Sequence, residues 1–496
     1  MCSANALGRE ALGRDDVRRV PRAFCCSKGL EARRSHQDQA LNTSRRKTEI
    51  MIPVEAQKEL LAQVARDEIK FINLQFTDIL GAVKSTPIPV RRLADSLEKG
   101  TWFDGSSIEG FGRICESDMF LVPDVTTYRV LPWTQPDRRI ARVICDVYRP
   151  DGKLFEGSPR NILRATLERA SRLGYVYNTG AELEFYLLRR NGERVHPVPH
   201  DVGGYFDFSL DMASTIREDI ALALQSMGME VEMTHHEVGP GQHEVDVRFS
   251  DALTCADNSL TVKYTVKAIA AAHDLYATFM PKPIFGLPGN GMHTHQSLFD
   301  TSGRNLFYDG ADHYRLSPLA YGFIAGQLTH ARALSAILSP TVNSYKRLVP
   351  GYEAPVYICW GQTNRSALIR IPRTSPGREG STRAELRSPD PSCNPYLAFA
   401  AMLAAGLDGV ERGLLPPEPV EENVYDFDDK RLAELKIATL PSSLEEALAE
   451  LENDAVLSDA LGAHTYKRLL EIKRSEWHDY RAQVTPWEMD RYLEVL

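Results

Sequence analysis

Hydrophobic and polar positions recur with two different periods along the chain, and these periods predict a mixed fold. Residues 54–68 (VEAQKELLAQVARDE) have the three- and four-residue apolar spacing of an amphipathic helix. From Ile69 the pattern changes to β-branched and aromatic runs that glycine and proline interrupt. These runs lie at 69–78, 81–90 and 141–150. The stretch 66–150 is therefore predicted to be a small domain built on a mixed sheet.

Helix-capping signals organise the rest of the chain. Ser158-Pro159 is expected to begin a helix that stops at Gly174, because serine favours the N-cap, proline the first turn and glycine the C-terminal end. Asn394-Pro395 opens another helix, which is expected to close near Gly409. This second helix is apolar on nearly all sides, which predicts that it is fully buried.

Charge is distributed unevenly along the 496 residues, of which 43% are hydrophobic and 25% charged, as is typical of a globular protein. Residues 1–50 hold 11 basic and 6 acidic side chains, and the remaining chain holds 47 basic and 61 acidic ones. The acidic body argues against nucleic acid as a partner, because phosphate binding needs a basic surface.

The first 50 residues are rich in arginine, weakly hydrophobic and without periodicity, which predicts a disordered extension. One hypothesis is that Met51 is the true start and that residues 1–50 are a start-site artefact. No apolar segment follows the basic N-terminus, so a secretory signal is not expected.

Neither membrane insertion nor a disulfide framework is expected. The longest apolar stretch, 396–407, has 12 residues, whereas a membrane span needs about 20. None of the eight cysteines forms a C-x-x-C pair. This cysteine usage predicts free thiols, mostly in the core, and a reducing, cytoplasmic location.

Two segments place carboxylates close together. In AELEF (181–185), strand alternation puts Glu182 and Glu184 on one face. In HHEVGPGQHE (235–244), Glu237 ends one segment, Glu244 begins the next, and a Gly-Pro-Gly turn joins them. Taken singly, a solvated strand face and a polar hairpin also explain these two patterns.

Two further segments add histidines and arginines. His293, His295 and Ser297 share one strand face after a glycine-rich turn, in which the backbone can approach a ligand closely. In RAELRS (383–388), an arginine, Glu385 and a second arginine share a face, a charge pattern that is costly to bury without partners. Arg365 and Arg370 have opposite strand parity, so alternation alone does not place both at one site.

A donor set of five glutamates and a single histidine can be drawn from these segments, and it suits Mg²⁺ or Mn²⁺ better than structural zinc. Nearby arginines suit a phosphate group. The P-loop signature G-x-x-x-x-G-K-[ST] is absent from the sequence. The residues alone therefore predict a metal-dependent enzyme that acts on a phosphate or a carboxylate.

Five long motifs in order resemble type I glutamine synthetase, over about residues 55–496. They lie at 104–124, 181–185, 235–244, 282–299 with 343–356, and 383–409. The resemblance implies an α+β fold with an N-terminal β-grasp domain, at 66–150. A catalytic domain follows at 157–496, built as an open α/β barrel of antiparallel strands with surrounding helices.

The resemblance also implies residue roles. The metal ligands would be Glu184, Glu237 and Glu244 for a first ion, and Glu182, His293 and Glu385 for a second. Nucleotide contacts would come from Glu232, His295, Ser297, Arg365 and Arg370. Glutamate and the transferred phosphate would meet Gly289, Arg347, Glu353, Arg365 and Arg387. The catalytic residues would be Glu353, Arg365 and Asp104, with Asp104 reaching the site of an adjacent subunit.

The implied activity is ATP-dependent ligation of ammonia to glutamate, with two or more Mg²⁺ or Mn²⁺ ions per subunit and a dodecamer of two hexameric rings. The family usually has Asn-Gly-Ser-Gly before Met-His, whereas this chain has Pro288 at the first of those positions. Proline offers no side-chain hydrogen bond. This departure keeps open a γ-glutamyl ligase that uses another amine, such as a polyamine. Arg113 and Tyr425 are the regulatory candidates, for glutamine feedback and for adenylylation respectively.

Overall fold

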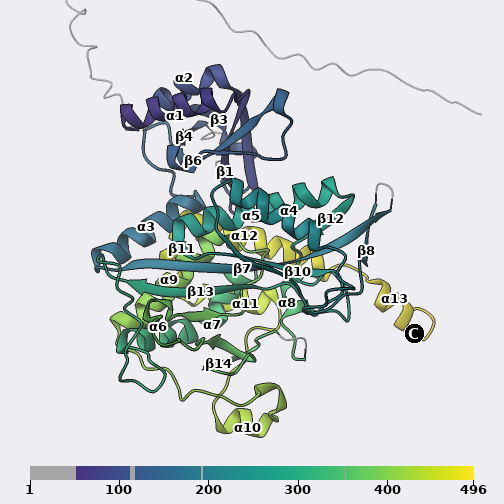
Figure 1. Ribbon diagram of the computed structural model, residues 1–496. Helices are drawn as coiled ribbons and strands as arrows, with labels where there is room; N and C mark the ends of the chain where they lie inside the picture. The colour runs from purple at the N-terminus through teal and green to yellow at the C-terminus, as the bar shows by residue number, and fades with distance from the viewer. Residues whose placement is uncertain (1–51, 112–117, 192–193, 352–353) are drawn as a thin grey trace, which may run out of the picture. The chain divides into compact units, whose positions relative to one another are not determined.

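The computed structural model of the protein describes residues 52–111, 118–191, 194–351 and 354–496 (Figure 1). The predicted disorder of residues 1–50 lies outside this part of the chain. None of the described helices combines the length and the apolar character that a membrane crossing requires. The described cysteines Cys145, Cys255, Cys359 and Cys393 are buried free thiols, as predicted.

A five-strand path with a parallel centre forms the N-terminal domain. Strand β1 (Phe71–Thr77) runs parallel to β6 (Ile140–Tyr148), and the order along the path is β2-β1-β6-β4-β3. The other elements are α1 (Val54–Arg66), β2 (Val83–Pro89), α2 (Leu93–Lys99), β3 (Thr101–Asp104), β4 (Asp118–Pro123) and β5 (Arg129–Val130).

Helix α1 and strands β1 and β2 lie within the segments predicted from periodicity, and β6 begins one residue before its predicted segment. The helix buries the seam formed by Leu60 and Val64. Strands β3 and β4 and helix α2 were not predicted. Strand β3 alternates between exposed and half-buried residues and is only four residues long, so it leaves little periodic signal.

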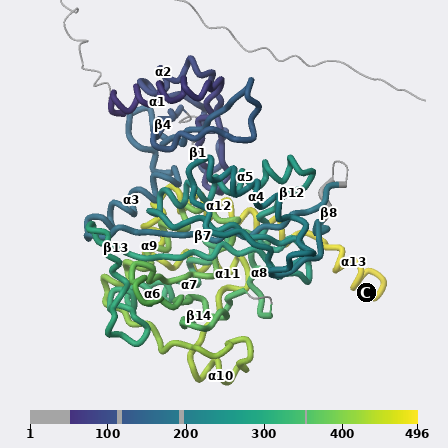
Figure 2. Tube along the Cα trace, viewed as in Figure 1, coloured from purple at the N-terminus to yellow at the C-terminus, as the bar shows by residue number. Residues whose placement is uncertain are grey.

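The C-terminal domain is organised around one long strand, β7 (Val176–Asn191). The sheet order is β14-β15-β16-β13-β7-β10-β9, and the pairing among these described strands is antiparallel except between β14 and β15. Figure 1 and Figure 2 show β13 (Met292–Phe299) alongside β7, in agreement with their register. The remaining strands are β8 (Arg194–Pro199), β9 (Val231–His236), β10 (Gln242–Val247), β11 (Ser250–Asp251), β12 (Leu275–Thr278), β14 (Tyr357–Gly361), β15 (Ala367–Arg370) and β16 (Ala384–Leu386).

Helices pack against this sheet and against one another. Helix α9 (Pro395–Glu411) is almost entirely buried, as its apolar pattern predicts, and the Asn394 side chain caps it by accepting from the Tyr396 N–H. Gly409 lets α9 touch the backbone of α6 (Pro318–Thr329), because a Cβ atom at Gly409 would collide with the Gly322 carbonyl. The other helices are α3 (Pro159–Arg172), α4 (Ser214–Ser226), α5 (Ala252–Ala272), α6 (Pro318–Thr329), α7 (Ala331–Leu338), α8 (Ser344–Arg347), α10 (Asp429–Glu434), α11 (Leu444–Glu452), α12 (Ala455–Arg481) and α13 (Pro486–Tyr492).

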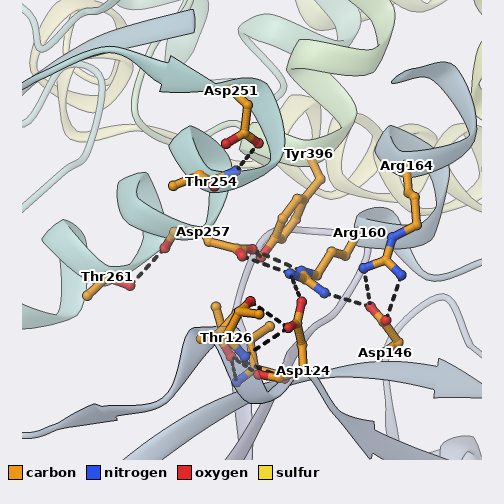
Figure 3. Close-up of polar contacts among 12 residues, drawn as sticks. Asp124, Thr126, Asp146, Arg160, Arg164, Asp251, Thr254, Asp257, Thr261 and Tyr396 are labelled. Carbon is orange, nitrogen blue, oxygen red and sulfur yellow. Dashed lines mark hydrogen bonds and ion pairs between the residues drawn. The ribbon is translucent and has the colours of Figure 1, made fainter. Parts of the chain in front are cut away.

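A buried cation on α3 joins the two domains (Figure 3). Nη1 of Arg160 donates to Asp146 at 2.7 Å, and Nη2 donates to Asp124 at 2.8 Å and to Asp257 at 2.9 Å. Arg164 adds a second guanidinium, 2.8 Å from Asp146. We call these five residues the Arg160 cluster. Its three carboxylates have two arginines as partners, so the charges largely neutralise one another inside the protein.

Candidate functional site

Strand β7 separates polar from apolar side chains by simple alternation. Glu182 and Glu184 lie on one face, whereas Leu183 and Phe185 on the other are fully buried in the core. This arrangement confirms the alternation predicted from AELEF.

The register of the sheet aligns further charged residues with these two glutamates. Glu244 of β10 is the cross-strand partner of Glu184. Glu182 has Asp246 of β10 on one side and His293 of β13 on the other. Cross-strand neighbours on one face are close enough for their side chains to interact.

The same row of charged side chains continues beyond β13. His295 is the cross-strand partner of Glu385, and Glu385 is the partner of Arg370. Residues that are far apart in the sequence thus form one continuous polar surface across β9, β10, β7, β13, β16 and β15.

The β9–β10 turn brings its two glutamates together, as predicted. The N–H of Glu237 donates to the Gln242 carbonyl at 2.8 Å, which closes the hairpin. The His235 ring lies between the carboxylates, with Nδ1 3.2 Å from an oxygen of Glu237 and Nε2 3.3 Å from an oxygen of Glu244.

Crowding of carboxylates gives this part of the site the electrostatics of a cation site. Burial, together with Glu184 and the other acids around it, raises the pKa of Glu244 to about 12. Glu184 is held in place by the Gly291 N–H, at 2.8 Å from Oε2. Like-charged carboxylates packed together are stable as anions only beside positive charge. The donor set of carboxylates with imidazole therefore fits Mg²⁺ or Mn²⁺.

Three groups of side chains have their ligand atoms within 4.8 Å of one another in this part of the chain. They are Glu182 with Glu244 and His293, Glu182 with His295 and Glu385, and His235 with Glu237 and Glu244. Five of the six predicted metal ligands occur in these groups. The sixth, Glu184, has a carboxylate oxygen 3.9 Å from Nδ1 of His293 in the first group. These groups cut across the two predicted trios, because His295 donates to Glu182 at 2.6 Å and His235 lies between Glu237 and Glu244, so the trios stay a prediction.

Glu385 is the most strongly paired of these carboxylates. It is fully buried and forms ion pairs with Arg387 and with Arg370, the latter at 3.0 Å. Burial raises its pKa, but the electrostatic influence of His295 and of the Arg387 and Arg370 guanidinium groups outweighs that effect and holds the pKa below its ordinary value. Glu385 therefore stays ionised beside the metal-binding candidates.

Two cavities meet at Glu182. The larger has a volume of about 790 Å³, in the range of small-molecule sites. The predicted nucleotide residues Glu232, His295 and Ser297 line it. Arg383 also lines it and donates to Nδ1 of His295 at 3.0 Å.

The smaller cavity has a volume of about 350 Å³ and a predominantly charged lining. The predicted residues that line it are Glu182, Glu184, Glu237, Glu244, Gly289, His293, Arg347, Arg365, Arg370 and Arg387. Arg365 and Arg370 both reach it despite their opposite parity, because Arg365 precedes β15 and only Arg370 belongs to the strand.

Two positions of the smaller cavity are sterically constrained. The guanidinium of Arg347 donates to the carbonyls of Ser388 and Arg387, at 2.8 and 3.1 Å, so this buried side chain is rigidly held. A Cβ atom at Gly289 would lie 2.6 Å from the Pro281 carbonyl oxygen and 2.7 Å from Cγ of Arg347. Only glycine fits there.

Pro288 occupies the position where the family usually has asparagine, and it lines the smaller cavity. Its carbonyl accepts from the Tyr186 hydroxyl at 2.8 Å. Asn290, two residues later, is fully buried and uses its amide on the Met280 carbonyl and the Gln242 side chain. The amide of Asn290 therefore does not replace the one that Pro288 lacks.

Three further side chains at the site were not predicted from the sequence. Gln242 donates to Glu184 at 3.2 Å, Tyr205 lines the smaller cavity, and Asp246 lines both cavities. Asp246 could have been found, because it lies two residues after Glu244 on the same strand face. Tyr205 belongs to an irregular loop, whose course no periodic pattern indicates.

Other predicted residues lie elsewhere. Asp104 is exposed at the end of β3, where it accepts from the Ser106 N–H, and it lines neither cavity of the described chain. Tyr425 is half-buried, and its hydroxyl donates to the Ala354 carbonyl at 2.6 Å. Glu353 and Arg113 lie outside the described residues.

Comparisons with known proteins agree with the geometry. The family models for the glutamine synthetase β-grasp domain and catalytic domain match residues 68–150 and 156–492. Glutamine synthetases from Thermotoga maritima and Methanocaldococcus jannaschii are 53% and 52% identical over 433 and 447 residues. These matches cover 87% and 88% of this chain and 98% of each relative.

A solved structure described as a GmaS/ADP complex is also similar, with a TM-score of 0.80 and 34% identity over 88% of this chain and 99% of that one. The predicted α+β fold, with a β-grasp domain followed by a catalytic domain, is confirmed. The chain belongs to the glutamine synthetase family of ligases.

Proposed function

We propose that the protein joins ammonia to the γ-carboxylate of L-glutamate at the expense of ATP, through a γ-glutamyl phosphate, and releases L-glutamine, ADP and phosphate. The observation that carries this proposal is the row of carboxylates and histidines that runs between a large cavity and a smaller, arginine-rich one. Such a row suits a reaction in which a phosphoryl group passes from a nucleotide to a carboxylate.

The metal ligands in this proposal are Glu184, Glu237 and Glu244 on one side, and Glu182, His293 and Glu385 on the other. Bound divalent ions would supply charge neutralisation for the phosphate oxygens. The larger cavity would hold ATP against Glu232, His295 and Ser297, which line it.

The arginines of the smaller cavity would orient glutamate and the transferred phosphate. Arg365, Arg370 and Arg387 all line this cavity, and guanidinium groups bind carboxylate and phosphate in a fixed geometry. Arg347 is already bound to two carbonyls, so we assign it the task of keeping Gly289 and Arg387 in place. Gly289 leaves room for the substrate to approach the backbone.

Proton removal from ammonium is assigned to Asp104 and Glu353, because only neutral ammonia is a nucleophile. Asp104 lines neither cavity of its own described chain, which supports the proposal that it serves the site of an adjacent subunit. We therefore propose a dodecamer of two hexameric rings, which native mass spectrometry would detect as twelve copies of the 55.6 kDa chain. We also propose a cytoplasmic location.

The test is γ-glutamyl product formation from glutamate, ATP and a panel of amines, with Mg²⁺ and Mn²⁺ tested separately. We expect ammonia to have the highest kcat/KM of the panel. A larger amine that ranks above ammonia would show that the assignment of the acceptor is wrong. Glu237→Ala should lose turnover with every amine and still assemble.

Ligation of another amine, such as a polyamine, is the second candidate. Pro288 supports it, because the smaller cavity lacks the side-chain amide usual at that position. A solved neighbour at 34% identity also bears the name GmaS rather than glutamine synthetase. Pro288→Asn tests whether residue 288 affects the binding of glutamate or the choice of amine. A lower KM for glutamate with an unchanged amine ranking would assign this position to glutamate binding alone.

A further inference from the structure

The β9–β10 hairpin has a second polar face, on the side of the sheet away from the candidate metal ligands. Because side chains alternate along a strand, His235 and Glu244 face the site, whereas their neighbours His236 and His243 face the interior. These interior histidines are only 2% and 0% exposed. His236 contacts Asp201, which lies between β8 and α4, whereas His243 contacts Arg217 of α4.

The carboxylate of Asp201 is completely buried, accepts three hydrogen bonds and lies close to a fourth polar group, the His200 ring. Oδ1 accepts from the Gly241 N–H at 2.9 Å and from Nε2 of His236 at 3.1 Å. Oδ2 accepts from the Met212 N–H at 3.1 Å and lies 3.0 Å from Nε2 of His200. One side chain thus ties the turn after β9 to both ends of the loop formed by residues 202–211.

His236 extends this restraint to the backbone of a candidate metal ligand. Its Nδ1 donates to the Glu237 carbonyl at 2.6 Å while its Nε2 donates to Asp201. Both ring nitrogens face acceptors, so the imidazole bridges the aspartate and the Glu237 backbone carbonyl. The β9–β10 turn is therefore held by hydrogen bonds to its backbone at two points, the Glu237 carbonyl and the Gly241 N–H.

The tethered loop reaches the site as well. It carries Tyr205, whose ring centroid lies 5.1 Å from that of His235 and which lines the smaller cavity. Asp201 does not line the smaller cavity, but it restrains two segments that do: the turn that carries Glu237 and the loop that carries Tyr205.

We propose that Asp201 is a positioning residue which, through His236 and Gly241, holds the turn that carries Glu237 in its metal-binding geometry. This inference rests on the proposed metal role of Glu237. Groups that orient metal ligands from behind typically contribute 10- to 100-fold to metal affinity or activity.

A metal site within the cluster is the competing explanation, because His200, Asp201 and His243 have ligand atoms within 4.8 Å of one another. Hydrogen bonding argues against it. Nη1 of Arg217 lies 3.1 Å from Nδ1 of His243, and a guanidinium only donates. Neutral His243 then carries its proton on Nε2, which leaves no ring lone pair for a cation. The two oxygens of Asp201 also already accept three hydrogen bonds, from Gly241, His236 and Met212.

The test is a Mn²⁺ titration of the assembled full-length Asp201→Asn protein by calorimetry, with the Mg²⁺ dependence of kcat measured alongside. Asparagine keeps an oxygen for Gly241 and His236 but loses the charge. We expect Mn²⁺ to bind about 10- to 100-fold more weakly and kcat to recover at saturating Mg²⁺. An unchanged Mn²⁺ Kd would overturn the proposal.

Asp146→Asn is the matched control, because it also removes a buried aspartate charge held by cationic partners, in the Arg160 cluster. It should lower the thermal midpoint without changing the Mn²⁺ Kd. Should Asp201→Asn fail to assemble, His236→Gln serves in its place. Its amide still donates to Asp201 but cannot also reach Glu237, so an unchanged Mn²⁺ Kd would again overturn the proposal.

Two other outcomes are distinct. Wild-type protein that binds no Mn²⁺ would refute the proposed function itself rather than the role of Asp201. A stoichiometric metal found by elemental analysis in wild-type protein, and lost from Asp201→Asn, would show that the cluster is a metal site and would overturn the positioning role.

Discussion

The Arg160 cluster and the carboxylates of β7 and β10 both gather acids in a buried place, but they balance the charge differently. In the Arg160 cluster, Asp124, Asp146 and Asp257 each contact a guanidinium at 2.9 Å or less. Within the described chain, the ion-pair partners of Glu184 and Glu244 are histidines alone, at 3.9 and 3.3 Å.

The difference separates a structural cluster from a functional one. Burying a carboxylate is tolerable when a cation of the same chain neutralises it, as Arg160 does. Where the chain leaves the negative charge uncompensated, the fold is stable only if something else supplies the positive charge. The raised pKa of Glu244 and of nearby Asp246, in both cases mainly through burial, follows from that deficit. This contrast can be tested by substituting one residue in either the Arg160 cluster or the carboxylates of β7 and β10.

The largest effect is expected from Glu244→Gln. It removes a proposed metal ligand, so kcat should fall at least about 1,000-fold, or about 4 kcal/mol. The metal-free protein should nevertheless unfold at a higher temperature than wild type, because a neutral amide avoids the cost of burying a carboxyl group among other acids. Activity assays and thermal scans in EDTA check the two directions. A lower midpoint in EDTA would mean that Glu244 is already neutralised by the chain.

Arg160→Met should have the opposite profile. It leaves three buried aspartates without their shared cation, which costs roughly 3–5 kcal/mol of unfolding free energy. Urea unfolding of the assembled protein measures this loss. Residual activity per assembled enzyme should stay near the wild-type value, because Arg160 lines neither cavity. A fall in kcat without a fall in stability would contradict the separation of the two clusters.

Metal addition should raise the unfolding free energy of the protein through the carboxylates of β7 and β10, and not through the Arg160 cluster. Mg²⁺ or Mn²⁺ at 100 times its Kd is expected to add about 2.7 kcal/mol of stability to the wild type. The gain should be much smaller in Glu244→Gln and unchanged in Arg160→Met. Thermal midpoints with and without the metal give the comparison, and an equal gain in all three proteins would place the metal elsewhere.

The smallest expected effect is a change in the pH dependence of stability, and it concerns His330. This histidine lies between two aspartates of the same chain. Its Nδ1 lies 2.5 Å from Asp454 and its Nε2 3.1 Å from Asp408. Burial lowers its pKa, but the bonds to Asp454 and Asp408 outweigh that effect and raise the pKa above the ordinary 6.5.

The folded protein therefore holds this proton to a higher pH than the unfolded chain does. The stabilisation, on the order of 1 kcal/mol, is complete below pH 6.5 and is lost as the pH rises through the raised pKa. Urea midpoints measured across this range should decline in the wild type. In His330→Gln this part of the decline should disappear, and an unchanged decline would exclude His330 as its source.

Much of the site could be predicted because it lies on regular strands. Alternation alone placed Glu182 with Glu184 and His293 with His295, and the Gly-Pro-Gly turn brought Glu237 to Glu244. The same regularity predicted the buried helix α9 from its apolar sequence.

Features that depend on contacts between distant segments could not be predicted in this way. The loop that carries Tyr205 has no period, and Arg365 reaches the smaller cavity from a turn rather than from a strand. The Arg160 cluster draws on β6, α3 and α5, so no local pattern in the sequence reveals it. The role proposed for Asp201 also depends on distant segments, because it follows from the contacts of this residue with His236 and Gly241 of the β9–β10 hairpin.

The alternation along β10 also limits which changes in chain length the protein can accept. Glu244 faces the site, while Val245 beside it is fully buried in the core. Deleting or inserting one residue within this strand would exchange the two faces, sending a valine into the cavity and a carboxylate into the apolar interior. Lineages of this enzyme should therefore lengthen or shorten freely in surface loops, while the spacing from Gln242 to Asp246 stays invariant.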